Sequence, residues 1–228
     1  MNKRILLIII SLAAVMTAAA FAVVSNSDRL SISMTFETIK QKLDQLTGEE
    51  LNASAVAQVE GIMIDQAAFT YAKLNRLQVR SLGGDSPLLT DEQIIEQLIT
   101  EQLVAEEALQ RGLTVTEEDI DEQITYQREA FDQLDPTDEK EVWFKEVVLQ
   151  GIQLHGMTEE EYWQSGKLRE AYRIAHLGGE LMREMVESGE VEGAQGYYEY
   201  QEELYRQIQD KIVYNHALLD EINATIHE

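Results

Sequence analysis

The chain of 228 residues contains no cysteine. This absence excludes structural disulfides, catalytic thiols and lipid attachment through a cysteine, so packing alone has to stabilise the fold. Hydrophobic residues make up 44% of the chain, which is long enough to bury one large core or two small ones. We therefore expect a folded protein, and neither a disordered tail nor a disulfide-stabilised mini-protein.

Positive charge is also scarce. The chain has 18 basic and 42 acidic side chains, which gives a net charge of -24. Such a charge opposes binding to the phosphates of nucleic acids and to anionic lipid headgroups, so no nucleic-acid partner is expected. We expect the acidic side chains to form a solvated, self-repelling surface that keeps the protein soluble, in preference to a dedicated docking face.

One long hydrophobic run, residues 5–24, carries no charge. As a helix it spans about 30 Å, the thickness of a bilayer's hydrocarbon core. Lys3 and Arg4 precede it and Asp28 follows it, so the N-terminus is expected in the cytoplasm and the bulk of the chain outside. Residues 1–28 are therefore predicted to hold a transmembrane signal anchor in the cell membrane.

The same run also fits a cleavable signal peptide. Ala18, Ala20 and Ala22 provide the small-x-small pattern that a signal peptidase reads. A retained single-pass anchor is the preferred interpretation, and secretion after cleavage is the alternative. Export of a chain without cysteine is typical of a bacterial protein.

Three similar motifs predict helix starts, at Thr90, Thr116 and Thr158, each followed three residues later by glutamine or an acid. The threonine oxygen accepts an unpaired amide of the first turn, the later side chain reaches back, and the acids meet the positive end of the helix dipole. Metal binding by these acids is the alternative, but one carboxylate-rich turn does not surround an ion. We expect capping boxes and no metal site.

The spacing of apolar residues predicts the other elements and a mainly helical fold with at most one or two short strands. Residues 188–196 are predicted to be a surface linker, and residues 211–214 either a terminal strand or a helix continuation. The predicted strand is residues 55–64, and the predicted helices are residues 34–46, 65–82, 91–112, 117–134, 142–152, 158–185 with a bend at Gly178 and Gly179, and 197–210.

Residues 89–116 form an apolar helix pattern that ends at Gly112 and is followed by a threonine-capped helix start. This stretch resembles the central helices of SurA-type N-terminal chaperone domains, and residues 59–64 with Phe69 look like the short strand and the helix that precede them in that family. The resemblance covers roughly residues 50–215 and is most specific in residues 89–124. It implies a helical chaperone domain over residues 51–228, after a stalk and first helix at residues 29–50.

Relatives in this family are extracytoplasmic chaperones and foldases. Many carry a parvulin-type prolyl isomerase domain, inserted before a final segment that returns to complete the chaperone domain. That position corresponds here to residues 188–196, which are too few to hold a catalytic domain. The resemblance thus implies an ATP-independent holdase that binds unfolded exported proteins and lacks isomerase activity. A structural adaptor that holds one dedicated partner in a cell-envelope complex is the alternative, and a prolyl isomerase comes third.

Sequence motifs for catalysis are missing. The four histidines, His155, His176, His216 and His227, show no metal-ligand spacing and no triad motif. We therefore expect no catalytic residue, cofactor or metal site.

Most aromatic and methionine side chains are expected in the core, but a holdase also needs a shallow apolar groove that accepts varied clients. Trp143, Phe144 and Trp163 are the predicted client-binding residues.

Overall fold

The computed structural model describes residues 54–81, 89–154 and 156–227. This part of the chain is mainly helical, as predicted, and includes a small sheet. The strands are β1 (Ala55–Val59), β2 (Ile62–Asp65) and β3 (Val213–Tyr214), and a 3-10 turn, η1 (Gln209–Lys211), precedes β3. The α-helices are α4 (Gln66–Ser81), α5 (Asp91–Gln110), α6 (Glu117–Asp132), α7 (Glu139–Leu154), α8 (Glu159–Trp163), α9 (Gly166–Glu187), α10 (Gly193–Arg206) and α11 (His216–His227).

The single strand predicted over residues 55–64 is a β-hairpin instead. β1 and β2 pair in antiparallel fashion, with Gln58 opposite Met63. The turn between them is Glu60–Gly61, whose φ angles are 47° and 95°. Positive φ at both central residues matches the twist of a two-residue hairpin, and glycine adopts it without strain. With β3 the sheet has three strands, one more than the prediction allowed.

β1 is the central strand of this sheet, whose order is β2-β1-β3. Ala55 lies opposite Asp65 and Ala57 opposite Ile64, so Val56 is an extra residue that forms a β-bulge. Because of the bulge, Ala55, Val56 and Ala57 are all buried, whereas a regular strand alternates between buried and exposed residues. The other edge of β1 pairs with β3, so the sheet joins the two ends of the described chain.

The structure confirms all three predicted capping boxes. Thr90, Thr116 and Thr158 accept backbone amides of the first turn at 3.3, 3.1 and 3.3 Å. The return bonds to their own amides measure 2.9, 3.0 and 2.7 Å. Asp65 caps α4 in the same way, by accepting the amide of Ala68 at 2.6 Å. Local sequence therefore determines where these helices begin.

The long helix predicted over residues 158–185 is broken. α8 ends at Trp163, and Ser165 starts α9 by accepting the amide of Leu168 at 3.1 Å. A serine side chain competes for backbone amides and therefore favours such a cap. α9 then continues through Gly178 and Gly179, where the sequence predicted a bend.

The chain after α9 is more helical than predicted. The predicted linker at residues 188–196 is reduced to residues 188–192, because α10 begins at Gly193. Residues 213–214 form a strand, which decides between the two predicted alternatives, and α11 follows although it was not predicted.

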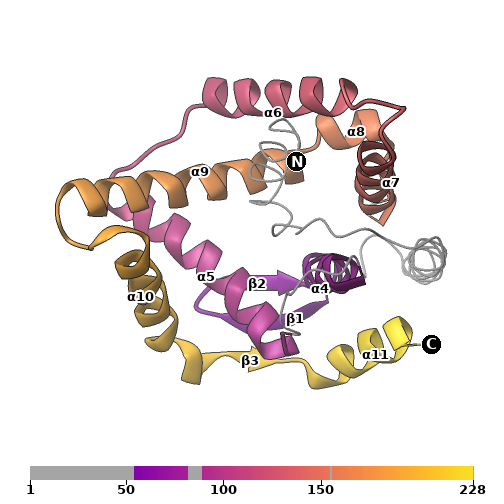
Figure 1. Ribbon diagram of the computed structural model, residues 1–228. Coiled ribbons are helices and arrows are strands. Elements are labelled where there is room, and N and C mark those ends of the chain that lie inside the picture. Colours follow the sequence, from indigo (N-terminus) through magenta and orange to yellow (C-terminus); the bar gives the residue numbers. More distant parts are fainter. Residues whose placement is uncertain (1–53, 82–88, 155, 228) are drawn as a thin grey trace.

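Three buried clusters follow one another along the molecule. The sheet cluster joins the sheet, α4, the start of α5 and α11; the middle cluster joins the ends of α5 and α9 with α10; the arm cluster joins α6, α7, α8 and the start of α9. Figure 1 shows α6, α7 and α8 above the sheet, and α10 at the left, where the chain turns from α9 toward β3. α5 and α9 each belong to two clusters and connect the whole. Representative members are Val56, Phe69, Ile95 and Leu219 in the sheet cluster, Val104, Leu181 and Tyr197 in the middle cluster, and Ile120, Phe131, Phe144 and Trp163 in the arm cluster.

Several predicted features lie outside the described residues. They are the anchor at residues 5–24, the boundaries of the segments 1–28 and 29–50, and the helix at residues 34–46. Among the helices in the described ranges, none combines the length and the apolar character needed to cross a membrane.

Candidate functional site

Two of the three predicted client-binding residues are buried in this structure. Phe144 is 5% exposed and Trp163 is 3% exposed, and both belong to the arm cluster. The ring of Trp163 lies 5.8 Å from that of Phe131 and 5.6 Å from that of Tyr162, measured between centroids. The side chain of Trp143 is outside the described part of the structure. Phe144 and Trp163 therefore act in packing, because their apolar area is already removed from water.

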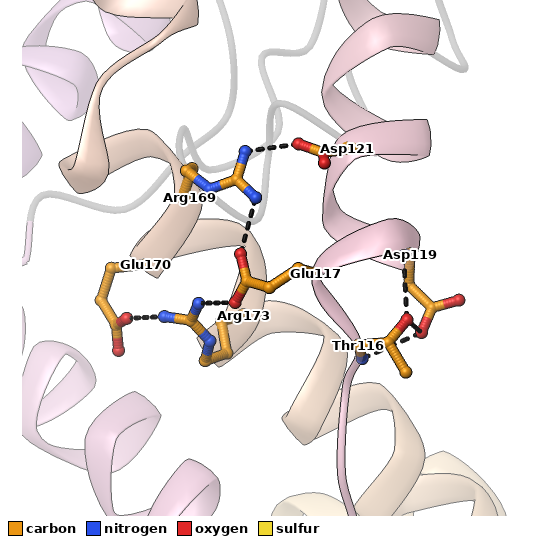
Figure 2. Close-up of polar contacts among 7 residues, drawn as sticks. All are labelled: Thr116, Glu117, Asp119, Asp121, Arg169, Glu170 and Arg173. Carbon is orange, nitrogen blue, oxygen red and sulfur yellow. Dashed lines mark hydrogen bonds and ion pairs between the residues drawn. The ribbon is translucent and has the colours of Figure 1, made fainter.

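An ion-pair network joins the start of α6 to α9 (Figure 2). Arg169 donates to Glu117 at 2.6 Å and also to Asp121, and Arg173 donates to Glu117 at 2.5 Å and also to Glu170. Hydrogen bonds from Arg169 and then Arg173 lower the pKa of Glu117. Single exposed pairs contribute little to stability, but here one carboxylate bridges two guanidinium groups and orients α6 against α9.

The close approach of α9 to α5 depends on Gly178. A Cβ atom at this position would lie 3.3 Å from Cγ1 of Val104 on α5. The hydroxyl of Tyr197 on α10 donates to the carbonyl of Gly178 at 2.9 Å. The residue that was predicted to bend a helix therefore allows three helices to meet in the middle cluster.

Arg111, at the end of α5, holds the turn between α9 and α10. It donates to Glu107 at 2.7 Å, to Glu184 at 3.2 Å and with two nitrogens to Glu190 at 2.7 and 2.8 Å. Its guanidinium also lies 5.8 Å from the ring centre of Tyr200. These bonds, chiefly those to Glu190 and Glu107, raise the pKa of Arg111. The turn at residues 188–192 is thus fixed to the end of α5.

α4 touches the arm through Tyr71. A Cβ atom at the buried Gly151 of α7 would lie 3.1 Å from Cε2 of Tyr71, so the ring rests directly on the backbone of α7. Burial raises the pKa of Tyr162 on α8 well above its ordinary value, and the neighbouring Tyr71 and Tyr172 add to the effect. In the described residues, α7 of the arm cluster therefore contacts α4 directly.

Residues 213–227, which we call the C-terminal segment, cover one edge of β1. Tyr214 lies opposite Ala57, and the amide of Asn215 donates to the carbonyl of Val56 at 2.9 Å. Asn215 then caps α11, because its side-chain oxygen accepts the amide of Leu218 at 3.2 Å. A strand and a helix of the same segment are thereby docked side by side.

Polar contacts connect the C-terminal segment to α4 and α5. Lys73 on α4 donates to Asp91 on α5 at 2.5 Å and also to Asn223 on α11, and Asn223 donates to Asp91 at 2.6 Å. At the other end, Lys211 pairs with Glu60 in the hairpin turn. Three helices thus share one partly buried polar triangle, which fixes the position of α11.

The outer face of the sheet carries exposed apolar side chains. Met63 of β2 is 53% exposed and Val213 of β3 is 70% exposed. Both lie opposite Gln58 of the central strand β1, one on each side of it. Residues paired across strands point to the same face, so these three side chains form one exposed row. The row lies on the solvent-exposed surface of the sheet.

The described residues were predicted to hold no metal site. No group of three or more histidine, aspartate or glutamate side chains in them is arranged to hold a metal ion. Of the four histidines, His155 lies outside the described residues. The sequence analysis missed the role of Gly178, the contact of Tyr71 with α7, and α11. Only α11 had a readable signal, since Leu218, Leu219, Ile222 and Ile226 follow helical spacing.

Comparison with known proteins identifies no relative. No family model, no curated protein and no solved structure matches the chain.

Proposed function

We propose that this chain is a membrane-anchored, extracytoplasmic, ATP-independent chaperone that binds unfolded exported proteins. The observation that carries the proposal is the return of the C-terminal segment to the first strand. β3 pairs with β1, and α11 packs into the sheet cluster. A final segment that returns to complete the chaperone domain is what the resemblance to SurA-type domains implies.

The order of elements in the most specific part of the resemblance also supports the proposal. α5 ends before Gly112, which has a φ of 81°, and a short connection leads to the capping box at Thr116 and to α6. The β1–β2 hairpin and α4 precede α5, where the family has a short strand and a helix. These local features support a SurA-type architecture for the chain.

Surface properties are consistent with binding unfolded protein without nucleotide. Apolar burial needs no ATP as a driving force. The net charge of -24 keeps a protein that binds through apolar contacts soluble.

The proposal includes no prolyl isomerase step. In the family, the isomerase domain is inserted at the position of residues 188–196, and here α9 and α10 are joined by residues 188–192 alone. Arg111 clamps this turn through Glu184 and Glu190. A proline-limited refolding assay that showed rate enhancement by the purified protein would contradict this part of the proposal.

Membrane attachment through residues 5–24 is the second part of the proposal. It rests on the uncharged length of this run and on Lys3 and Arg4 before it. We expect native protein in the membrane fraction with an intact N-terminus and the full mass of 25.9 kDa. A mature protein that begins after Ala20 or Ala22 would instead establish secretion.

The central test is suppression of aggregation. The full chain is reconstituted in lipid nanodiscs and mixed at a near-equimolar ratio with proteins diluted from denaturant, without nucleotide. We expect light scattering to fall relative to empty nanodiscs. Absence of suppression for several unrelated clients would reject the chaperone function.

In-cell crosslinking separates the chaperone from a structural adaptor. A broad set of exported proteins captured in unfolded form is expected for the chaperone. One dominant folded partner at constant stoichiometry would favour the adaptor in a cell-envelope complex.

A further inference from the structure

β1 is held very differently by its two neighbours. β2 follows it through a two-residue turn and pairs with it from Ala55–Asp65 to Val59–Ile62. β3 comes from the far end of the chain and pairs with β1 at Ala57 and Gln58 alone. The edge of β1 that faces β3 therefore has the shorter hydrogen-bonded contact.

Beneath α11 lies an apolar surface formed by the sheet, α4 and α5. Leu219 and Ile222 of α11 are buried in the sheet cluster, together with Val56 of β1, Phe69 of α4 and Ile95 of α5. α4 contacts both β1 and α5, and α5 contacts β2, so these elements also pack against one another without α11.

The C-terminal segment follows Ile212 and η1 in the described chain. Its departure from β1 would open the bond of Asn215 to Val56 and the bonds of Asn223 with Lys73 and Asp91, and would expose Leu219 and Ile222. Elements whose backbone is paired over a short stretch are the parts of proteins that open locally while the core stays folded.

We propose that the C-terminal segment is a removable cover and that unfolded clients bind in its place, by adding a strand to β1. This inference rests on the proposed function and specifies how clients are recognised. Strand addition uses backbone hydrogen bonds, which are independent of sequence and suit varied clients, while side-chain pockets supply preference.

The seated segment defines the chemistry of the partner. Val213 and Tyr214 are extended and β-prone, and the apolar Leu219 and Ile222 follow after a short interval. The partner is thus an unfolded polypeptide with a short β-prone stretch next to apolar residues. The net charge of -24 disfavours acidic clients, because like charges oppose their approach.

A disulfide that locks β3 onto β1 tests the proposal. Gln58 and Val213 are Cα partners in antiparallel strands and both are exposed. Such partners lie about 4.5–5.5 Å apart, within the range that a disulfide bridges. Because the chain has no cysteine, Gln58→Cys/Val213→Cys carries the only two thiols. The matched control is Gln58→Cys/Met63→Cys, which locks the hairpin across the other edge of β1.

The probe is fluorescein-labelled lysozyme that has been reduced and carbamidomethylated, which is basic and stays unfolded. Binding to the full chain in nanodiscs is measured by anisotropy with and without dithiothreitol. Oxidation of the Gln58→Cys/Val213→Cys variant is expected to raise Kd at least tenfold, reduction restores binding, and the control changes less than twofold. Equal binding by the oxidised and reduced lock overturns the inference alone. No binding by wild type and both reduced variants rejects the proposed function as well.

Hydrogen exchange of the wild-type chain provides a readout that needs no disulfide. Saturating probe is expected to accelerate exchange at the amides of Asn215 and Leu219, which lose Val56 and the first turn of α11 as partners. The amide of Ile94, bonded within α5, serves as the control and is expected to keep its rate. Unchanged or slowed exchange at Asn215 and Leu219 would show that the cover stays in place and would overturn the proposal.

Discussion

The adjacent glycines of α9 give the sharpest test of how the middle cluster is packed. An added Cβ at Gly178 meets Val104 Cγ1 at 3.3 Å, whereas at Gly179 it meets nothing within 4 Å. Val104 is 3% exposed and β-branched, so its side chain has one preferred rotamer in a helix and no free space to turn into. The two substitutions to alanine therefore differ in packing and share the same backbone effect.

The magnitudes follow from three contributions. Replacing a helical glycine by alanine stabilises by about 1 kcal/mol at either position. At Gly178 the overpacking costs about 1–3 kcal/mol, and displacement of the carbonyl weakens its bond to Tyr197 by up to about 1 kcal/mol. We expect Gly179→Ala to be more stable than wild type by about 1 kcal/mol and Gly178→Ala to be less stable by up to about 3 kcal/mol.

The difference in stability between the two variants, about 1–4 kcal/mol, is independent of helix propensity because that contribution cancels. It is measured by urea unfolding followed by circular dichroism, with both variants and wild type in the same membrane mimetic. An unchanged m-value shows that the same surface is exposed on unfolding. Equal stabilisation by both alanines would refute the claim that Gly178 is required for the contact with α5.

Three further predictions concern caps and ion pairs. Thr90→Ala is expected to lower the free energy of unfolding by about 1 kcal/mol through loss of the capping box, whereas Thr125→Ala, exposed inside α6, lowers it little or not at all. Arg111→Lys keeps the charge but loses the two-nitrogen contact with Glu190, so we expect a loss of about 1 kcal/mol and faster amide exchange in residues 188–192. The pKa of Glu117 is depressed below its ordinary 4.5 in the folded chain, so its stabilisation is present above that value and is lost as pH falls through the folded pKa. Glu117→Gln is therefore expected to be less stable than wild type at pH 6, and the difference is expected to shrink as the pH falls below 4.5, in urea titrations at each pH.

Helix starts were predictable because they depend on a few neighbouring residues. The threonine caps at positions 90, 116 and 158 place donor and acceptor three residues apart, so the pattern is complete within one turn. The hairpin was missed because Glu60–Gly61 is a weaker signal than asparagine or aspartate before glycine. The cap at Ser165 was missed because apolar spacing continues across it.

The candidate site was less predictable because it is made of contacts between distant residues. Large aromatic side chains suggested an exposed groove, but whether Phe144 and Trp163 are exposed depends on which helices cover them. The covered edge of β1 requires Val56 and Asn215, which are far apart in the chain, to share a hydrogen bond. No periodic pattern within one element contains that information.

The amino-acid sequence by itself determined the helical character, the capped starts of α5, α6 and α8, and the end of α5 at Gly112, since each depends on backbone preferences within a turn. Only the tertiary structure decided that Gly178 allows helices to meet, that Phe144 and Trp163 are buried, and that the C-terminal segment covers β1. The physical reason is that burial and pairing are set by which surfaces exclude water together. That depends on the packing of the whole chain and not on any single element of it.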